Sequence, residues 1–215
     1  VLFRSQGGID LYSARGIDYP WLARRAAEGR FMLYELGPTM SRFFLTCNQN
    51  GDTNPATGAP YVDPVKRRWF TSRTFRRALA YAINKQEIID IVFNGLAIPQ
   101  HTTMSPASGY FYNPDVPAYP YDPAQARALL AAEGFRDTDG DGVLEDAAGN
   151  PVSFTLMINA GSAQGTQLAN LVRKDLALLG CDVQLVPVEF NALSNKIFFT
   201  YDWDTLLMGM TGGVE

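Results

Sequence analysis

The densest group of residues that could do chemistry is the acidic run Asp137-Thr138-Asp139-Gly140-Asp141-Gly142. Acids at positions one, three and five, with glycine at six, match the start of an EF-hand calcium loop, whose seventh residue supplies a backbone carbonyl. The twelfth position is Ala148 instead of the bidentate glutamate, so Glu145 or Asp146 must complete the shell. The alternative is a structural polar turn, in which Asp and Gly supply Asx-turns and positive φ. The predicted calcium ligands are Asp137, Asp139, Asp141, Val143 and Glu145.

The chain has little material for catalysis. His101 is the single histidine, in a loop rich in Thr, Ser and Pro, and a Ser-His-Asp triad or a zinc site would depend on it alone. The sequence has no Gly-x-Ser-x-Gly, no GxGxxG and no GxxxxGK(S/T) motif, so hydrolase and nucleotide chemistry are unsupported. We therefore predict a protein that is not an enzyme.

Bulk composition fits one globular domain, or one lobe of a larger protein: 215 residues, 47% hydrophobic and 19% charged. A net charge of -4 and a pI near 5.0 argue against a nucleic-acid partner. No apolar run reaches the about 18 residues that span a bilayer. Cys47 and Cys181 each lie in an apolar segment, so we expect two buried thiols, with a long-range disulfide as the open alternative.

The first half of the chain predicts two strands, a loop and two helices. Short aromatic runs at residues 31–36 and 43–48 are typical of strands. Residues 49–66 are rich in Asn, Gly, Asp, Thr and Pro and predict a long surface loop. The predicted helices are one capped by Ser72 or Thr74 and one over residues 85–94.

The second half predicts an α/β layer. Residues 96–121 carry five prolines and predict irregular chain. The aromatic stretch Tyr110-Phe111-Tyr112 could stack on sugar rings, but we expect it to pack against its own lobe. Strands are predicted at 152–158, 181–188 and 203–208, with helices at 123–133, 163–179 and 191–199. Such a βαβ order places helices on a sheet.

Two segments identify a family. Residues 75–89 read FRRALAYAINKQEII and residues 121–130 read YDPAQARALL, and together they resemble family 5 of the extracellular solute-binding proteins, the peptide, nickel and oligosaccharide receptors of bacterial ABC importers. The resemblance implies an α/β, periplasmic-binding-protein-like (Venus-flytrap) lobe, with a mixed sheet flanked by helices. It makes residues 1–40 the end of the first lobe near the hinge, and residues 41–215 the second-lobe domain, truncated at its carboxyl end.

The resemblance also implies a non-catalytic function. The expected protein is the solute-binding component of a bacterial ABC importer for peptides, which captures ligand between two lobes and delivers it to the membrane permease. The alternatives are an oligosaccharide receptor of the same family and a ligand-sensing receptor for a signalling protein. We expect a monomer in the periplasm or outside the cell, tethered as a lipoprotein in some hosts, with no required cofactor and calcium as the one candidate.

By the same resemblance, the ligand contacts come from loops at the ends of the second-lobe strands. In dipeptide-binding relatives an aspartate in the place of Gly213 pairs with the ligand's amino terminus, and an arginine follows the strand that ends here at Asn159. The loop 160–164 has no cation, and neutral groups suit amides and hydroxyls better than a carboxylate. We therefore expect a longer peptide or a neutral ligand, unless Glu215 or the missing lobe supplies the charge. The predicted contacts are Asn159, Ser162, Gln164, Met210, Thr211, Gly212, Gly213 and Glu215.

Overall fold

The computed structural model describes residues 10–14, 16–29 and 31–211. The chain divides into two compact units: the first contains the residues up to Met40 together with Lys85–Pro114, and the second contains Ser41–Asn84 together with the chain from Asp115 onward. Their assignment to a first and a second lobe stays a prediction. Within the described residues, no helix combines the length and the hydropathy needed to cross a bilayer.

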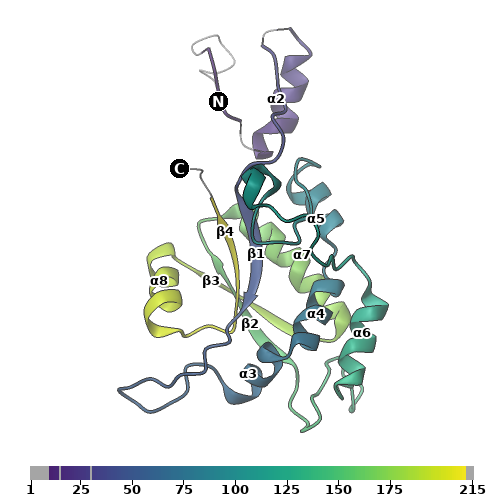
Figure 1. Ribbon diagram of the computed structural model, residues 1–215, viewed down its shortest axis with the longest axis vertical. Helices are drawn as coiled ribbons and strands as arrows, with labels where there is room; N and C mark the ends of the chain where they lie inside the picture. The colour runs from purple at the N-terminus through teal and green to yellow at the C-terminus, as the bar shows by residue number, and fades with distance from the viewer. Residues whose placement is uncertain (1–9, 15, 30, 212–215) are drawn as a thin grey trace. The chain divides into compact units, whose positions relative to one another are not determined.

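The second unit is built on a four-stranded mixed sheet (Figure 1). Its strands are β1 (Arg42–Cys47), β2 (Ser153–Asn159), β3 (Asp182–Val188) and β4 (Thr205–Met210), in the spatial order β1-β4-β2-β3. β2 pairs in parallel with β3 and with β4, whereas β1 runs antiparallel to β4. The expected mixed sheet flanked by helices is therefore confirmed.

Helices cover the two faces of this sheet unequally. α4 (Arg73–Ala82), α6 (Pro123–Ala132) and α7 (Ala163–Leu179) lie on one side, as Figure 1 shows. The short α8 (Phe190–Asn195), continued by the π-helical turn η3 (Lys196–Thr200), lies on the other. The first face is therefore covered by these three helices, and the second face by about three helical turns.

Local chemistry determines where the long helices begin and end. Ser162 caps α7, because its Oγ accepts a hydrogen bond from the backbone N–H of Gly165 at 2.9 Å. Gly180 ends the same helix in the left-handed conformation, with φ of 96°, which a glycine adopts without strain. Asp122 caps α6 in the same way, through the N–H of Gln125 at 2.9 Å. These are the boundaries that the sequence predicts.

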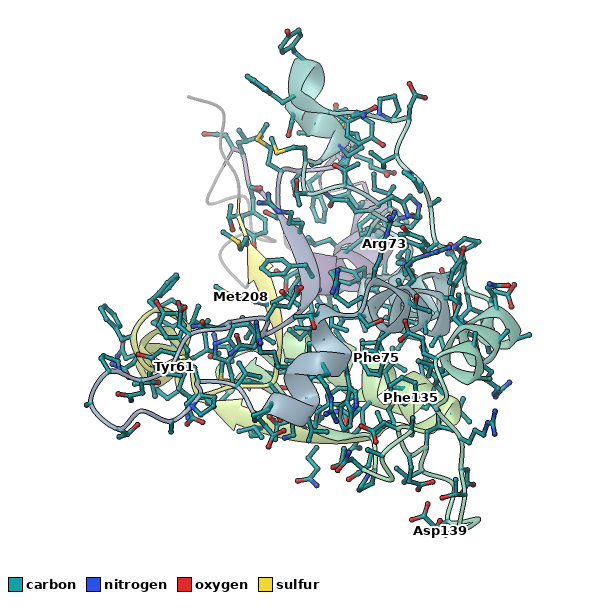
Figure 2. The ribbon with its side chains drawn as sticks, turned by 60° about the horizontal axis from the view of Figure 1, so that its bottom comes forward. Tyr61, Arg73, Phe75, Phe135, Asp139 and Met208 are labelled. Atoms are coloured by element: carbon teal, nitrogen blue, oxygen red, sulfur yellow. The ribbon has the colours of Figure 1, made fainter. Side chains whose placement is uncertain are left out.

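Aromatic side chains fill the space between the sheet and the helices before it. Phe70 belongs to α3 (Pro64–Thr71), and its ring meets that of Phe154 on β2 edge-on at 5.7 Å. The ring centroids of Phe75 on α4 and Phe135 lie 5.5 Å apart, and both residues are labelled in Figure 2. Burying one such ring stabilises the fold by about 1.5–3 kcal/mol, so this cluster holds α3 and α4 against β2.

The first unit is helical in its described part. Its elements are η1 (Gly16–Asp18), α2 (Tyr19–Ala26), α5 (Lys85–Val92) and the 3-10 helix η2 (Pro106–Phe111). Two hydrogen bonds join its distant segments: Ser105 Oγ donates to the carbonyl of Thr39 at 2.7 Å, and Asn94 Nδ2 donates to the carbonyl of Gly16 at 3.2 Å. These bonds tie the two sequence-separated parts of the unit together.

Two expectations for this unit are wrong. Residues 31–36 form no strand, and Met32, Tyr34 and Leu36 are 75%, 69% and 94% exposed. A stable strand needs a partner ladder and a covered face, and the described residues supply neither here. The aromatic loop also does not pack against its own unit, because Tyr110 and Phe111 are 96% and 67% exposed.

The loop expected at residues 49–66 ends earlier than predicted. Asp63 caps α3, since its Oδ1 accepts from the backbone N–H groups of Val65 and Lys66 at 2.8 and 3.1 Å. Pro64 occupies the first helical position, where its missing N–H costs nothing. The polar composition of residues 49–66 led to the prediction of a loop up to Lys66, so the helix start at Asp63 and Pro64 was missed.

Other boundaries shift for local reasons. Of the two candidate caps for α4, Ser72 is the one used, through its Oγ. Glu189, and not Asn191, caps α8 with its carboxylate. The last strand begins later than the predicted 203–208, because the ladder of β4 starts only where Thr205 meets both neighbouring strands.

Both cysteines are buried free thiols, as expected. Burial raises the pKa of the Cys47 thiol to about 12, although the charge of Arg76 acts in the opposite direction. Burial alone raises the pKa of Cys181 to about 12. Each therefore packs as a small apolar side chain and not as a nucleophile or a metal ligand.

Candidate functional site

The carboxyl ends of β2, β3 and β4 meet at one edge of the sheet, because these strands are parallel. We refer to this edge, where the strands end at Asn159, Val188 and Met210, as the carboxyl edge. Open α/β sheets bind ligands outside the carboxyl ends of their strands. The structure therefore brings the two predicted contact loops, after β2 and after β4, to the same edge.

The loop after β2 is a turn held by its own polar groups. Asn159 Oδ1 accepts from the N–H of Gly161 at 3.0 Å, and the N–H of Ser162 donates to the Asn159 carbonyl at 3.1 Å. Ser162 Oγ is also the cap of α7. Asn159, Ser162 and Gln164 are all half-buried. The Asn159 amide N–H groups and the Ser162 hydroxyl proton are neutral donors that the hydrogen bonds of this turn do not use.

The loop after β4 is described as far as Thr211, which is exposed. Met210 is 44% exposed at the end of the strand. Before it, Gly209 lies under the ring of Phe43 on β1, and a Cβ at this position would lie 3.0 Å from the nearest ring carbon. A glycine is thus needed for Phe43 to lie flat on β4. The other predicted contacts, Gly212, Gly213 and Glu215, lie outside the described residues.

β1 brings a cation to this edge that the sequence analysis missed. Because β1 runs antiparallel to β4, its first residue, Arg42, pairs with Met210. Arg42 is half-buried, and among the described residues no ion pair involves it. The loop 160–164 has no cation, but the edge as a whole has one. Only the strand register reveals this, since the two residues lie far apart in the sequence.

The acidic run forms a compact turn between α6 and β2. One carboxylate oxygen from each of Asp137, Asp139, Asp141 and Glu145 lies within 4.8 Å of the others. Oxygens at roughly 2.3–2.6 Å from a shared Ca²⁺ lie within about 5 Å of one another, so the spacing fits the ion. Figure 2 shows Asp139 far from Met208 of β4, so an ion held here would not touch a ligand at the carboxyl edge.

The same carboxylates also hold the turn by themselves. Asp137 accepts from the N–H groups of Gly140 and Gly142 at 2.7 and 3.1 Å. Glu145 is 8% exposed, and its Oε2 accepts from the N–H and the Oγ1 of Thr138, both at 2.7 Å. Gly140 and Gly142 have φ of 83° and 92°, where side chains would be strained. The structural turn and the calcium loop predicted from the sequence thus share one geometry.

The opposite edge of the sheet, where β2 and β4 begin, holds a network that the sequence analysis did not predict. Asp204 precedes β4, and its Oδ2 accepts from Lys66 Nζ at 2.7 Å and from the N–H and Oγ1 of Thr155, both at 2.9 Å. Asn48 follows β1, is 3% exposed, and donates from Nδ2 to two backbone carbonyls of the turn 201–203 at 3.0 and 2.9 Å. We refer to this end as the amino edge.

Two hollows of the described surface lie away from the carboxyl edge. One, of about 430 Å³, lies between the acidic turn and α7 and is lined in part by Asp141 and Arg173. The other, of about 380 Å³, lies beside the amino edge and is lined in part by Tyr61 and Asp204. Neither includes a predicted ligand contact of the carboxyl edge.

Comparison with known proteins identifies the family. The family model described as bacterial extracellular solute-binding proteins, family 5 Middle, matches residues 2–215. The chain belongs to family 5 of the bacterial extracellular solute-binding proteins. Family 5 proteins are solute-binding receptors of ABC importers and not enzymes, in agreement with the lack of a catalytic motif in the sequence.

Three family 5 relatives are informative. The probable ABC transporter-binding protein of Deinococcus radiodurans is 28% identical over 216 residues, which is 96% of this chain and 35% of that protein. The oligopeptide-binding protein AppA of Bacillus subtilis is 33% identical over 146 residues, 67% of this chain and 27% of that protein. Its structure with a nonapeptide matches with a TM-score of 0.74 at 26% identity, over 98% of this chain and 38% of AppA.

The periplasmic binding protein MelB of Agrobacterium fabrum, solved with stachyose, matches with a TM-score of 0.72 at 25% identity, over 97% of this chain and 32% of MelB. The chain thus spans about a third of the length of the relatives that it matches. In each of them, most of the protein lies outside the region that corresponds to this chain.

Proposed function

We propose that this chain is part of a two-lobed receptor that binds a peptide at the carboxyl edge and delivers it to the membrane permease of an ABC importer. The observation that carries the proposal is the carboxyl edge, where Asn159 and Ser162 have donors that their own turn does not use and Met210 is 44% exposed. Closure of a second lobe over this edge would bury the ligand and add the contacts that one lobe lacks.

Peptide is the substrate class that we favour. The neutral amide and hydroxyl donors of Asn159 and Ser162 match backbone carbonyls of an extended peptide. Support also comes from AppA, an oligopeptide-binding protein by name, which is 33% identical over 67% of this chain. The stachyose complex of MelB, with a similar TM-score, supports the alternative of an oligosaccharide.

The proposal includes the partners and the location. The receptor acts as a monomer, with the permease subunits as its protein partners and the peptide as its ligand. The family is one of extracellular proteins, and within that description we propose the periplasm or the outside of the cell, with a lipoprotein tether to the membrane in some hosts.

A thermal-shift screen of the two-lobed receptor tests the function. Di-, tri- and pentapeptides and stachyose would be compared at the same concentration. Preferential binding to the native state stabilises it by about 2.7 kcal/mol when ligand exceeds the Kd a hundredfold, which gives a measurable rise in Tm. We expect tripeptides and longer peptides to raise the Tm, and stachyose to leave it unchanged. A rise in Tm with stachyose alone would show that the ligand is an oligosaccharide and not a peptide.

We also propose that the acidic turn binds Ca²⁺ as a structural ion, through Asp137, Asp139, Asp141, Glu145 and the carbonyl of Val143. The gathering of four carboxylate oxygens within 4.8 Å supports it. Calcium should raise the Tm of the chain, EDTA should reverse the rise, and Asp139→Asn should abolish it, while Asp52→Asn, in the exposed loop after β1, should not. An unchanged Tm in the unsubstituted chain would leave the turn with its structural role only.

A further inference from the structure

The side chains at the carboxyl edge can be assigned to one face of the sheet. Met157 of β2 and Leu206 of β4 are buried in the cluster that contains Leu193 of α8. Alternate residues of a strand share a face, so Asn159 lies on the face of Met157, and Met210 on that of Leu206.

Arg42 lies on the same face. It is paired with Met210 in the antiparallel ladder, and directly paired residues have their side chains on the same side. The next residue of β1 on this face is Phe44, which is paired with Met208. Arg42 therefore lies on the same face of the sheet as Asn159, at the end of the row formed by Phe44, Met208 and Met210.

A guanidinium in this place favours an anion as its partner. Its five N–H donors form a planar fork that fits a carboxylate in a bidentate manner. Its neighbours on the face, Met208, Met210 and Phe44, are apolar and cannot accept these hydrogen bonds strongly, and no described residue forms an ion pair with it. Closure of a lobe over this edge would remove water from the charge, and a desolvated charge needs an opposite one.

We propose that Arg42 binds the terminal carboxylate of the peptide, while the turn at Asn159 and Ser162 binds the peptide backbone. This inference rests on the function proposed above and adds the ligand chemistry: a peptide with a free carboxyl terminus. Of the two ligand classes expected from the sequence, a longer peptide and a neutral ligand, it selects the peptide, because β1 supplies a cation that the loop after β2 lacks.

The register also gives the distance between the backbones of the two proposed contacts. β1 and β2 are separated by β4, so Arg42 and Asn159 are two strand spacings apart, about 10 Å. Leu207 pairs with Ile158, so Met210 extends two residues, about 7 Å, beyond the level of Asn159. The two backbones are therefore about 12 Å apart, which an extended chain of three to four residues spans.

The experiment compares free-acid and carboxyl-amidated forms of tri- and tetra-alanine by calorimetry on the two-lobed receptor. We expect the unsubstituted receptor to bind the acids at least about tenfold more tightly than the amides, the loss expected when one charged partner is removed. Arg42→Gln should abolish this preference and leave the affinity for the amides unchanged. Arg136→Gln removes an exposed arginine at the start of the acidic turn and is the matched control, which should keep the preference.

The outcomes separate this inference from the function on which it rests. Equal affinity of the unsubstituted receptor for acids and amides, or a preference that survives in Arg42→Gln, overturns the role of Arg42 and leaves peptide capture intact. Failure of every peptide to bind overturns both proposals. A preference lost equally in Arg136→Gln would show a long-range charge effect and also overturn the assignment.

Discussion

The two edges of the sheet differ in where their polar groups find partners. At the amino edge, the Asp204 carboxylate accepts three hydrogen bonds, and the Asn48 amide donates two to backbone carbonyls. At the carboxyl edge, the Asn159 amide supports only a local turn, and Arg42 forms no ion pair with a described residue. At the amino edge the polar side chains hold the fold, and at the carboxyl edge we propose that they bind a ligand.

This difference follows from the strand directions. The three parallel strands place the loops that follow them at the carboxyl edge, and the antiparallel β1 adds its first residue, Arg42, there. At the other end, the chain leaves β1 towards α3 and enters β4 from the turn after η3, and both connections must be fixed for the register to form. Substitutions at the amino edge should therefore lower stability, and those at the carboxyl edge should lower affinity.

The largest effect on stability should come from Asp204→Ala. The side chains of Asp204 and Lys66 are 15% and 28% exposed, so the substitution leaves a partly buried ammonium and the Thr155 N–H without their acceptor. We expect a loss of about 2–4 kcal/mol in the free energy of unfolding, measured by urea denaturation. Asp202→Ala removes a carboxylate that is 76% exposed and should change it by no more than about 0.5 kcal/mol. Similar losses of unfolding free energy in Asp204→Ala and Asp202→Ala would contradict the assignment of Asp204 to the network that holds the amino edge.

Asn48→Ala should have the next largest effect. The amide is 3% exposed and is the partner of two carbonyls of the turn before β4, which the substitution leaves unpaired. The expected loss is about 2 kcal/mol in the same assay. Asn191→Ala, at an exposed position of α8, is the control and should be near neutral. An Asn48→Ala variant as stable as this control would show that these hydrogen bonds do not hold the amino edge.

Acid should destabilise the second unit through Asp146, which lies in the turn before β2. Burial would raise the pKa of this carboxyl group, but hydrogen bonds from Asn150, Trp69 and Ala148 outweigh it and lower the pKa to about 2. A lowered native pKa means that the stabilisation is complete above the usual value of 3.8 and is lost as the pH falls from there towards 2. Unfolding measured from pH 6 to pH 2 should show this loss in the unsubstituted chain, and Asp146→Asn should lack it. Parallel curves would contradict the assignment.

The smallest effect on stability should come from Arg42→Gln. No described residue forms an ion pair with Arg42, so the unfolding free energy should change by no more than about 0.5 kcal/mol. Urea denaturation of the chain measures this directly. A loss near that of Asp204→Ala would mean that Arg42 holds the fold and is not kept for a ligand.

Features that depend on neighbouring residues could be predicted from the sequence. The helix 163–179 was correct at both ends, because Ser162 and Gly180 act on backbone groups within a few residues. The acidic turn was also recognisable, because the carboxylates of Asp137, Asp141 and Glu145 accept hydrogen bonds from groups within residues 138–143. Its calcium ion stays a prediction, because the same residues fit both interpretations.

Features that depend on register could not be predicted. Arg42 reaches the carboxyl edge only because β1 pairs with β4 in the antiparallel sense, and nothing near it in the sequence indicates that. Lys66 was assigned to a loop, yet it ends in an ion pair with Asp204. The wrong strand at residues 31–36 has the same origin, since its pattern is suitable but no described strand pairs with it.

Hydrogen exchange of the two-lobed receptor, with and without a saturating tripeptide, tests the contrast between the edges most directly. The account predicts that added protection within this chain is concentrated in the segments after β2 and after β4, residues 159–165 and 208–215, and in the start of β1 at Arg42. Amides around Asn48 and Asp204 should already be protected and should not change. Protection that appears at the amino edge or the acidic turn, with none after β2 and β4, would contradict the account.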